Sequence, residues 1–268
     1  MRTLKYSILT LIGIVHLIPF YILLGMALKP TEDTSSKWIF PTNMTMDNFV
    51  NAWNQAHLSQ ALINNVIITG SSVVLIVLIG ALASYPLSRF QTKWNQFIYL
   101  LCISCMIVPA LTILVPLYSM IVDMGGINTY WAAILTQVTF QLPLTIFLFT
   151  GFISSVPREL DEAGSIDGCN KFMIFFRIIL PLLKPITATV IILTGLNVWN
   201  DYQFSIFLLQ KVSVQTIPVA LSQFISQFQN QISWVAAGCV IGMLPVTILY
   251  LFLQKYFIRG LADGAVKG

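Results

Sequence analysis

Long apolar stretches with almost no charge constrain this chain more than any other feature of its sequence. Only 9% of the residues are Asp, Glu, Lys or Arg, whereas about 25% is usual for a soluble domain. So few polar groups cannot cover a water-exposed surface, and lipid is the expected solvent. A helix of about 20 residues crosses the hydrocarbon core of a bilayer. The sequence predicts six such spans: Tyr6–Leu28, Leu62–Leu87, Phe97–Val122, Thr129–Val156, Ile178–Val198 and Ser233–Leu253.

These spans predict an all-α, polytopic membrane protein whose residues 1–268 form a single domain. Lipid offers no hydrogen bonds, so a spanning segment must be a helix or part of a closed barrel. The apolar runs are too long and too continuous for barrel strands, which alternate over about ten residues. The first run is also longer than the apolar core of a signal peptide, which is about 7–15 residues, so we expect a retained helix. The fifth span is the weakest, because Lys184 and two prolines lie in its first turns.

Basic residues are concentrated in the connections on one side of the predicted spans. Cytoplasmic loops carry an excess of Lys and Arg, and this excess sets the orientation. Of the 14 basic residues, all but three lie on one side; the exceptions are Lys29, Lys37 and Lys211. We therefore expect both termini to be cytoplasmic, in a multi-pass protein of the plasma or inner membrane. The net charge of +4 reflects this asymmetry, and we do not expect nucleic-acid binding.

The segment 157–185, between the fourth and fifth spans, is the one sizeable charged feature on the cytoplasmic side. Pro157 suits the first turn of a short helix, and the acids that follow are favoured near a helix N-terminus: Glu159, Asp161 and Glu162. Ala163 and Gly164 are small, and Asp167-Gly168 indicates a chain reversal. A helix with a small-residue face can press closely into a groove on a soluble partner. The alternative is an ordinary cytoplasmic loop that contains a short helix.

Several functional classes lack the residues they need. The sequence contains no Gly-Lys pair, so it has no GxxxxGK[ST] phosphate-binding loop and cannot itself be an ATPase. Two histidines without clustered ligands support no metal site. No Asp or Glu lies inside a predicted span, which disfavours an ion-coupled secondary carrier. A membrane-embedded enzyme would need an intramembrane acid, a His pair or a Ser-His constellation, and the sequence offers none.

The charged segment resembles the cytoplasmic loop of permease subunits in bacterial ATP-binding-cassette importers. That loop reads Glu-Ala-Ala, then Gly four residues on, then Ile-x-Leu-Pro; here it is Glu162-Ala163-Gly164, Gly168 and Ile178-Ile179-Leu180-Pro181. Residues 83–89 resemble the end of the second span in that family, and 109–118 resemble its third span. The tail 260–268 is similar to tails of carbohydrate-uptake permeases of the maltose-importer type. The resemblance covers essentially the whole chain.

The resemblance implies a non-enzymatic transport subunit with several partners. These are a second permease subunit, two cytosolic ATPase subunits that use ATP and Mg²⁺, and an extracellular or periplasmic solute-binding protein that delivers a sugar. No cofactor is expected on this chain. The helix around Glu162 would be a coupling helix seated in the ATPase, with contacts from Glu159, Glu162, Ala163, Gly164, Asp167 and Gly168. Gly164 departs from the usual Ala, which predicts a shorter or more closely packed helix.

A polar and aromatic cluster at the outer end of the fifth span is the candidate for the sugar path. It comprises Asn197, Trp199, Asn200 and Asp201, followed by Tyr202. Amides and carboxylates can hydrogen-bond sugar hydroxyls, while rings stack on sugar C–H faces. The alternatives are an aromatic belt at the interface for the rings and helix packing for Asn197, which we expect to face the bundle interior. Because no span interior carries Arg or Lys, a neutral oligosaccharide is favoured over glycerol-3-phosphate or another polyol.

Overall fold

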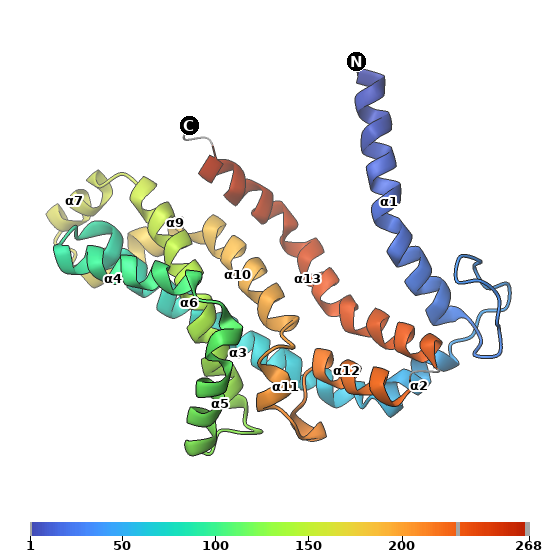
Figure 1. Ribbon diagram of the computed structural model, residues 1–268. Helices are drawn as coiled ribbons and strands as arrows, with labels where there is room; N and C mark the ends of the chain where they lie inside the picture. Colours follow the sequence, from blue (N-terminus) through green and yellow to red (C-terminus); the bar gives the residue numbers. More distant parts are fainter. Residues whose placement is uncertain (1, 229–230, 266–268) are drawn as a thin grey trace. The chain divides into compact units, whose positions relative to one another are not determined.

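In the described part of the computed structural model, residues 2–228 and 231–265, all regular secondary structure is helical and there is no strand (Figure 1). Apart from short turns of helix, the elements in chain order are α1 (Arg2–Leu28), α2 (Asp47–Gln55), α3 (Leu58–Arg89), α4 (Lys93–Ser104), α5 (Leu114–Asp123), α6 (Tyr130–Ser155), α7 (Glu159–Ile166), α10 (Lys184–Trp199), α12 (Ile217–Gln227) and α13 (Ile232–Ala265). The chain divides into two compact units, Met1–Asn64 with Gln215–Pro245, and Asn65–Val214 with Val246–Gly268.

Two of the six predicted spans are sharply bent, whereas the other four are long helices. α1, α3, α6 and α13 are each long and apolar enough to cross a membrane. The third span breaks into Lys93–Ile107 and Ala110–Asp123 at an angle of 96°, and the fifth into Lys171–Leu182 and Lys184–Trp199 at 73°. Within the described residues, the number of spans is therefore four by unbroken helices and up to six if each bent pair counts as one. The all-α, multi-pass fold class is confirmed.

Proline accounts for both breaks. A proline cannot donate a backbone hydrogen bond and disfavours the helical region for the residue before it. Val108 accordingly adopts ψ 119° before Pro109, where the turn Cys105–Ile107 ends and the turn Ala110–Ile113 begins. In the fifth span the helical pieces α8 (Lys171–Ile174), η3 (Phe175–Ile179, a π-helix) and α9 (Leu180–Leu182) end at Leu183, and Pro185 lies in the first turn of α10. Both predicted spans are therefore present as helical pieces with a bend between them.

The first unit is held together where α2 meets the end of α1. Asn48 is almost fully buried, and its amide donates hydrogen bonds of 2.8 Å to the carbonyls of Ala27 and Lys29. These carbonyls have no partner within the helix because α1 ends there. The apolar core of this unit contains alanines of α1, of α2 with its C-cap and of α13, which let helices approach closely. Its buried members are Ala27, Ala52, Ala56, Leu58, Phe224, Ala236, Ala237 and Val240.

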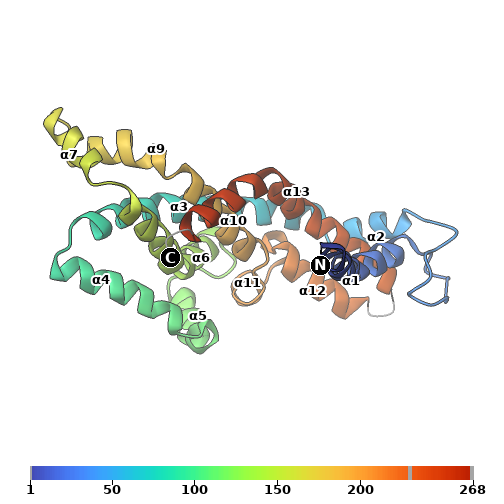
Figure 2. The same cartoon turned by 90° about the horizontal axis from the view of Figure 1, so that it is seen from above.

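The second unit has a larger core, and α6 contributes much of it. Phe149 and Ile153 of α6 are fully buried, as are Ile179 and Val190 of the fifth span. Phe140 stacks on Phe204 with ring centroids 4.5 Å apart. α7 lies at one end of this unit in both ribbon views (Figure 2). The core therefore fixes the elements that precede and follow α7 along the chain.

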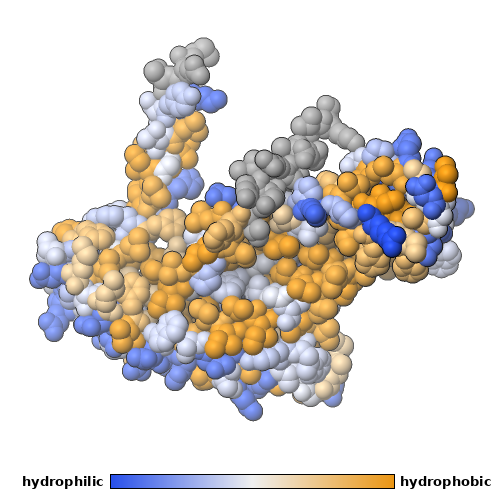
Figure 3. Space-filling model, turned by 180° about the vertical axis from the view of Figure 1, so that it is seen from behind, coloured by the Kyte–Doolittle hydropathy of each residue, from blue (hydrophilic) through white to orange (hydrophobic). Residues whose placement is uncertain are grey.

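Apolar side chains dominate the outer surface. Most residues of α1 are exposed although its mean hydropathy is high, and Figure 3 shows apolar residues over much of the visible face. A soluble monomer rarely exposes contiguous apolar patches of more than a few hundred Å². This exterior is suited to lipid and to other subunits of a membrane complex.

Candidate functional site

The charged segment forms a short helix, α7, with its acids at the N-terminal end. α7 spans Glu159–Ile166, and its first turn carries Glu159, Asp161 and Glu162. Negative charge there is stabilised by the helix dipole. The helix begins two residues later than Pro157, with Arg158 at the N-cap position and without a capping side chain. The predicted helix is thus present, although Pro157 lies just outside it.

Gly168 ends α7 in a Schellman motif. The amide of Cys169 donates to the carbonyl of Gly164 at 2.9 Å, and the amide of Gly168 donates to that of Ser165 at 3.1 Å. This pair of bonds requires a left-handed residue after the helix, and Gly168 has φ +81°. A Cβ on Gly168 would meet no atom within 4 Å, so the backbone angle, rather than space, calls for glycine. The predicted chain reversal is therefore built on this residue.

Gly164 is the point where α7 packs against the start of the fifth span. It is the buried residue of α7, and a Cβ there would lie 2.8 Å from Ile178 Cδ1 and 3.1 Å from Ile174 Cγ1. Such separations are shorter than van der Waals contact between carbons, so alanine would push these two side chains aside. The close packing expected from the departure at Gly164 is present.

The remaining predicted coupling residues form an exposed surface on α7. Glu159, Glu162, Ala163, Asp167 and Gly168 are all exposed. Two large apolar side chains that are not among the predicted coupling residues are also exposed in this segment, with 86% of Ile166 and 74% of Phe172 accessible. Ile166 ends α7 and Phe172 lies in α8 (Lys171–Ile174). Large apolar residues within an otherwise polar segment are the signal that could have identified them, since such exposed side chains often mark a contact with a partner.

Asp161 is a further residue that the sequence analysis does not place in the site. Its carboxylate accepts a hydrogen bond of 2.9 Å from Tyr85 Oη and lies 2.9 Å from Arg89 Nη2. Arg89 Nη1 also donates to the carbonyl of Val156 at 3.0 Å. A cavity of about 190 Å³ adjoins this group, lined by Tyr85, Arg89, Phe90, Arg158, Asp161, Glu162, Ser165, Lys171 and Ile174. The i, i+4 spacing of Tyr85 and Arg89 puts both on one helix face.

The four residues predicted for the sugar path lie at the end of α10, apart from the coupling residues along the chain, and have different surroundings. Asn197 is exposed, and its amide donates to Gln141 Oε1 of α6 at 3.3 Å. Trp199 is buried. The amide of Asn200 donates to the carbonyl of Leu196 at 2.9 Å.

The carboxylate of Asp201 holds the short helix α11 (Ser205–Leu208) at its start. It accepts hydrogen bonds from the Ser205 hydroxyl at 2.7 Å, the Ser205 amide at 3.0 Å and the Phe204 amide at 3.3 Å. An acid in this position satisfies amides that have no partner within the helix. Asp201 therefore has a local structural role that its sequence context does not indicate.

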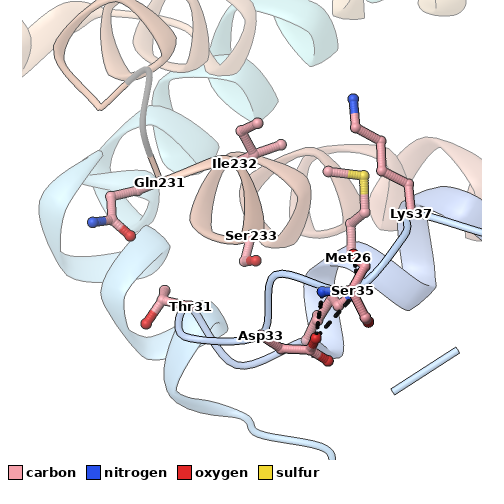
Figure 4. A pocket seen from close by; sticks show the side chains of 9 residues that line it. Met26, Thr31, Asp33, Ser35, Lys37, Gln231, Ile232 and Ser233 are labelled. Atoms are coloured by element: carbon pink, nitrogen blue, oxygen red, sulfur yellow. Dashed lines mark hydrogen bonds and ion pairs between the residues drawn. The ribbon is translucent and has the colours of Figure 1, made fainter. Parts of the chain in front are cut away.

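A second cavity, also of about 190 Å³, lies in the first unit between the loop after α1 and the start of α13 (Figure 4). Lys29 is buried there and donates to the carbonyls of Ser35 and Ser36 at 2.7 and 3.1 Å. Hydrogen bonds from Ser35, with a smaller contribution from Lys29, lower the pKa of Asp33. Lys29 and Asp33 thus already have hydrogen-bond partners within the loop after α1. Within the described residues, no group of three or more His, Cys, Asp or Glu could hold a metal ion.

The comparisons of this chain with known proteins agree on one family. Residues 76–263 match the family model described as "Binding-protein-dependent transport system inner membrane component". The chain is 50% identical to the melibiose/raffinose/stachyose import permease protein MelC of Bacillus subtilis (strain 168), over 100% of this chain and 99% of the relative.

More distant relatives and a solved structure agree in length and fold. The multiple sugar-binding transport system permease protein MsmG of Streptococcus mutans is 34% identical, over 98% of this chain and 96% of that protein. A chain of a crystal structure of a bacterial ABC transporter involved in the import of the acidic polysaccharide alginate has a TM-score of 0.80 at 20% identity. The match covers 96% of this chain and 97% of that one. At this identity the likeness shows the fold.

Proposed function

Because the chain belongs to the family of binding-protein-dependent transport system inner membrane components, we propose that it is a permease subunit of an ATP-driven oligosaccharide importer. It forms half of the translocation pathway and works with a second permease subunit. A solute-binding protein delivers the sugar from outside, and two cytosolic subunits bind ATP with Mg²⁺ and hydrolyse it. This chain binds neither a cofactor nor a metal in this proposal.

The exposed face of α7 is the observation that carries this proposal. A charged first turn and two exposed apolar side chains, Ile166 and Phe172, accompany a helix whose opposite side is fixed by Gly164. An apolar anchor surrounded by polar groups is typical of a protein–protein contact. We assign the ATPase as its partner, with these residues around the contact: Glu159, Glu162, Ala163, Asp167 and Gly168. ATP-driven movement of the ATPases would then displace α7.

The substrate we propose is a neutral oligosaccharide. The MelC relative is named for import of melibiose, raffinose and stachyose, and these sugars are the first candidates here. The exposed amide of Asn197 and the amide of Gln141 beside it can hydrogen-bond sugar hydroxyls. Asn200, at the C-cap of α10, is a further candidate, whereas Trp199 is buried and the carboxylate of Asp201 is bonded to Ser205. No observation favours glycerol-3-phosphate or a polyol.

Uptake by whole cells tests the proposal. Cells with and without this gene are given labelled melibiose, raffinose, stachyose, maltose or glycerol-3-phosphate. Loss of one or more of the oligosaccharides, restored by the gene on a plasmid and dependent on cellular ATP, is the expected result. Loss of glycerol-3-phosphate uptake alone, or sugar uptake driven by an ion gradient without ATP, would contradict it.

Docking of the ATPase is tested separately with Ile166→Glu. A charge in an apolar contact is unfavourable unless it is paired, so the ATPase should no longer co-purify with the permease pair. Met44→Glu is the matched control, because Met44 is also a large exposed apolar residue but lies in the loop after α1. Co-purification that survives Ile166→Glu would remove α7 from the contact.

A further inference from the structure

Asp161 connects α7 to two other elements of the same unit. Its two carboxylate oxygens contact the side chains of Tyr85 and Arg89, each at 2.9 Å. Tyr85 and Arg89 belong to the last turns of α3, and the carbonyl that Arg89 binds, at Val156, is the C-cap of α6. A single carboxylate and a single guanidinium therefore join the coupling helix to the adjacent ends of α3 and α6.

Tyr85 and Arg89 are buried and the Asp161 side chain is 19% accessible, so the ion pair is weakly screened by water. Arg89 is only 9% accessible and Tyr85 only 7%, whereas the acids in the rest of the first turn of α7 are exposed. Removing one member of a buried ion pair leaves the other charge without compensation, so such a pair resists separation. The aromatic rings of Phe90 and Phe175 pack on Tyr85, with centroids 6.2 and 5.4 Å away, and limit its movement.

The other side of α7 is attached differently. There Gly164 is in contact with Ile174 and Ile178, which precede α10 along the chain. That contact is close apolar packing and involves no charged group. α7 thus has a charged and hydrogen-bonded connection toward α3 and α6, and an apolar packing contact toward the fifth span.

From this arrangement we infer that Asp161, Tyr85 and Arg89 are positioning residues that make α7 and the end of α3 move together. The inference rests on the proposed function, because it assumes that the ATPase displaces α7. Displacement of α7 then pulls on α3 through the carboxylate, and the span follows. Without the carboxylate, α7 can move while α3 stays behind, and ATP is hydrolysed without import.

The first test measures sugar imported per ATP hydrolysed by the complete importer, purified with its own partner subunits and reconstituted in liposomes. Raffinose is the probe. Asp161→Asn keeps the shape of the side chain but removes its charge, and it should lower the ratio about tenfold, within the range typical of coupling between two sites. Asp161→Glu retains the carboxylate and should restore most of the ratio. Asp123→Asn, an exposed acid distant in sequence, is the control and should leave it unchanged.

A second measurement tests whether Asp161 transmits the movement of α7 to α3 or only stabilises the fold. Spin labels are placed at Ser165 on α7 and Gln91 just after α3, both exposed, after replacement of the four cysteines. With Asp161 present, the distance between the labels should stay constant when ATP binds. With Asp161→Asn it should change. A general loss of structure would instead broaden the distances in both nucleotide states, which would overturn the inference in favour of a purely structural role.

The outcomes distinguish this inference from the function on which it rests. If the wild-type complex imports sugar and Asp161→Asn leaves the ratio of sugar to ATP unchanged, the inferred link between α7 and α3 is wrong. The proposed importer function is unaffected by that result. A constant label distance in Asp161→Asn would have the same two consequences. If the wild-type complex imports no sugar at the expense of ATP, the proposed function is wrong, and so is the inferred link between α7 and α3 that rests on it.

Discussion

At the scale of single residues, Gly168 offers the sharpest test of the coupling helix. Its φ of +81° costs a residue with a Cβ about 1–2 kcal/mol, and Asn less because its side chain bonds locally. Gly168→Val should therefore loosen the end of α7 and depress sugar uptake strongly, while Gly168→Asn should retain most of it. Both proteins should insert in the membrane in normal amounts, as checked by immunoblotting. Equal uptake by the two variants would remove the Schellman motif from the coupling mechanism.

Asn197 and Gln141 test the sugar path at the same scale. If the two amides face the sugar, replacing either with Leu should raise the KM for raffinose uptake by about tenfold, the loss expected when a few hydrogen bonds to a substrate disappear. Melting temperature in detergent should change little, because Asn197 is exposed. A lower melting temperature with an unaltered KM would mean that the pair serves only to pack α6 against α10.

Local rules predict some of these residues and miss others for a physical reason. The acids of α7 and Gly168 can be identified because dipole and turn preferences depend on neighbours in sequence. The partners of Asp161 lie elsewhere, with Tyr85 76 residues away, and no spacing rule reaches that far. Asp201 is predicted as a sugar ligand because its type fits, yet its oxygens are occupied by Phe204 and Ser205.

At the scale of helices, Asn48 in the first turn of α2 should contribute strongly to stability, because it joins α2 to the end of α1. Asn48→Leu would leave the carbonyls of Ala27 and Lys29 buried without this donor, at a cost of about 1–3 kcal/mol each. The melting temperature of the purified protein should fall by several degrees. Asn43→Leu is the control, because Asn43 is exposed in the loop that precedes α2, and it should leave the melting temperature unchanged. An equal fall in both variants would show that the buried amide of Asn48 has no special role.

The sequence predicts the existence of the helices better than their continuity. The length of an apolar run can be read directly from the sequence, and α1, α3, α6 and α13 lie where such runs predict them. The two prolines in the first turns of the fifth span mark the place of its bend at Leu183, whereas the bend at Pro109 in the third span is not predicted. Proline is tolerated inside membrane helices when neighbours satisfy the freed groups, as at Pro143 within α6. Which prolines bend a span depends on packing that the sequence does not display.

At the scale of the whole molecule, the orientation in the membrane decides whether α7 can meet a cytosolic ATPase. The excess of Lys and Arg on one side predicts that α7 is cytoplasmic and that the loop after α1 is outside. In a variant without its four cysteines, a single cysteine at the exposed position Phe172 should react with a membrane-impermeant maleimide only after the cells are opened. A cysteine at Met44, also exposed, should react in intact cells. Labelling of the Phe172→Cys variant in intact cells would invert the topology, and an ATPase in the cytosol could then no longer reach α7.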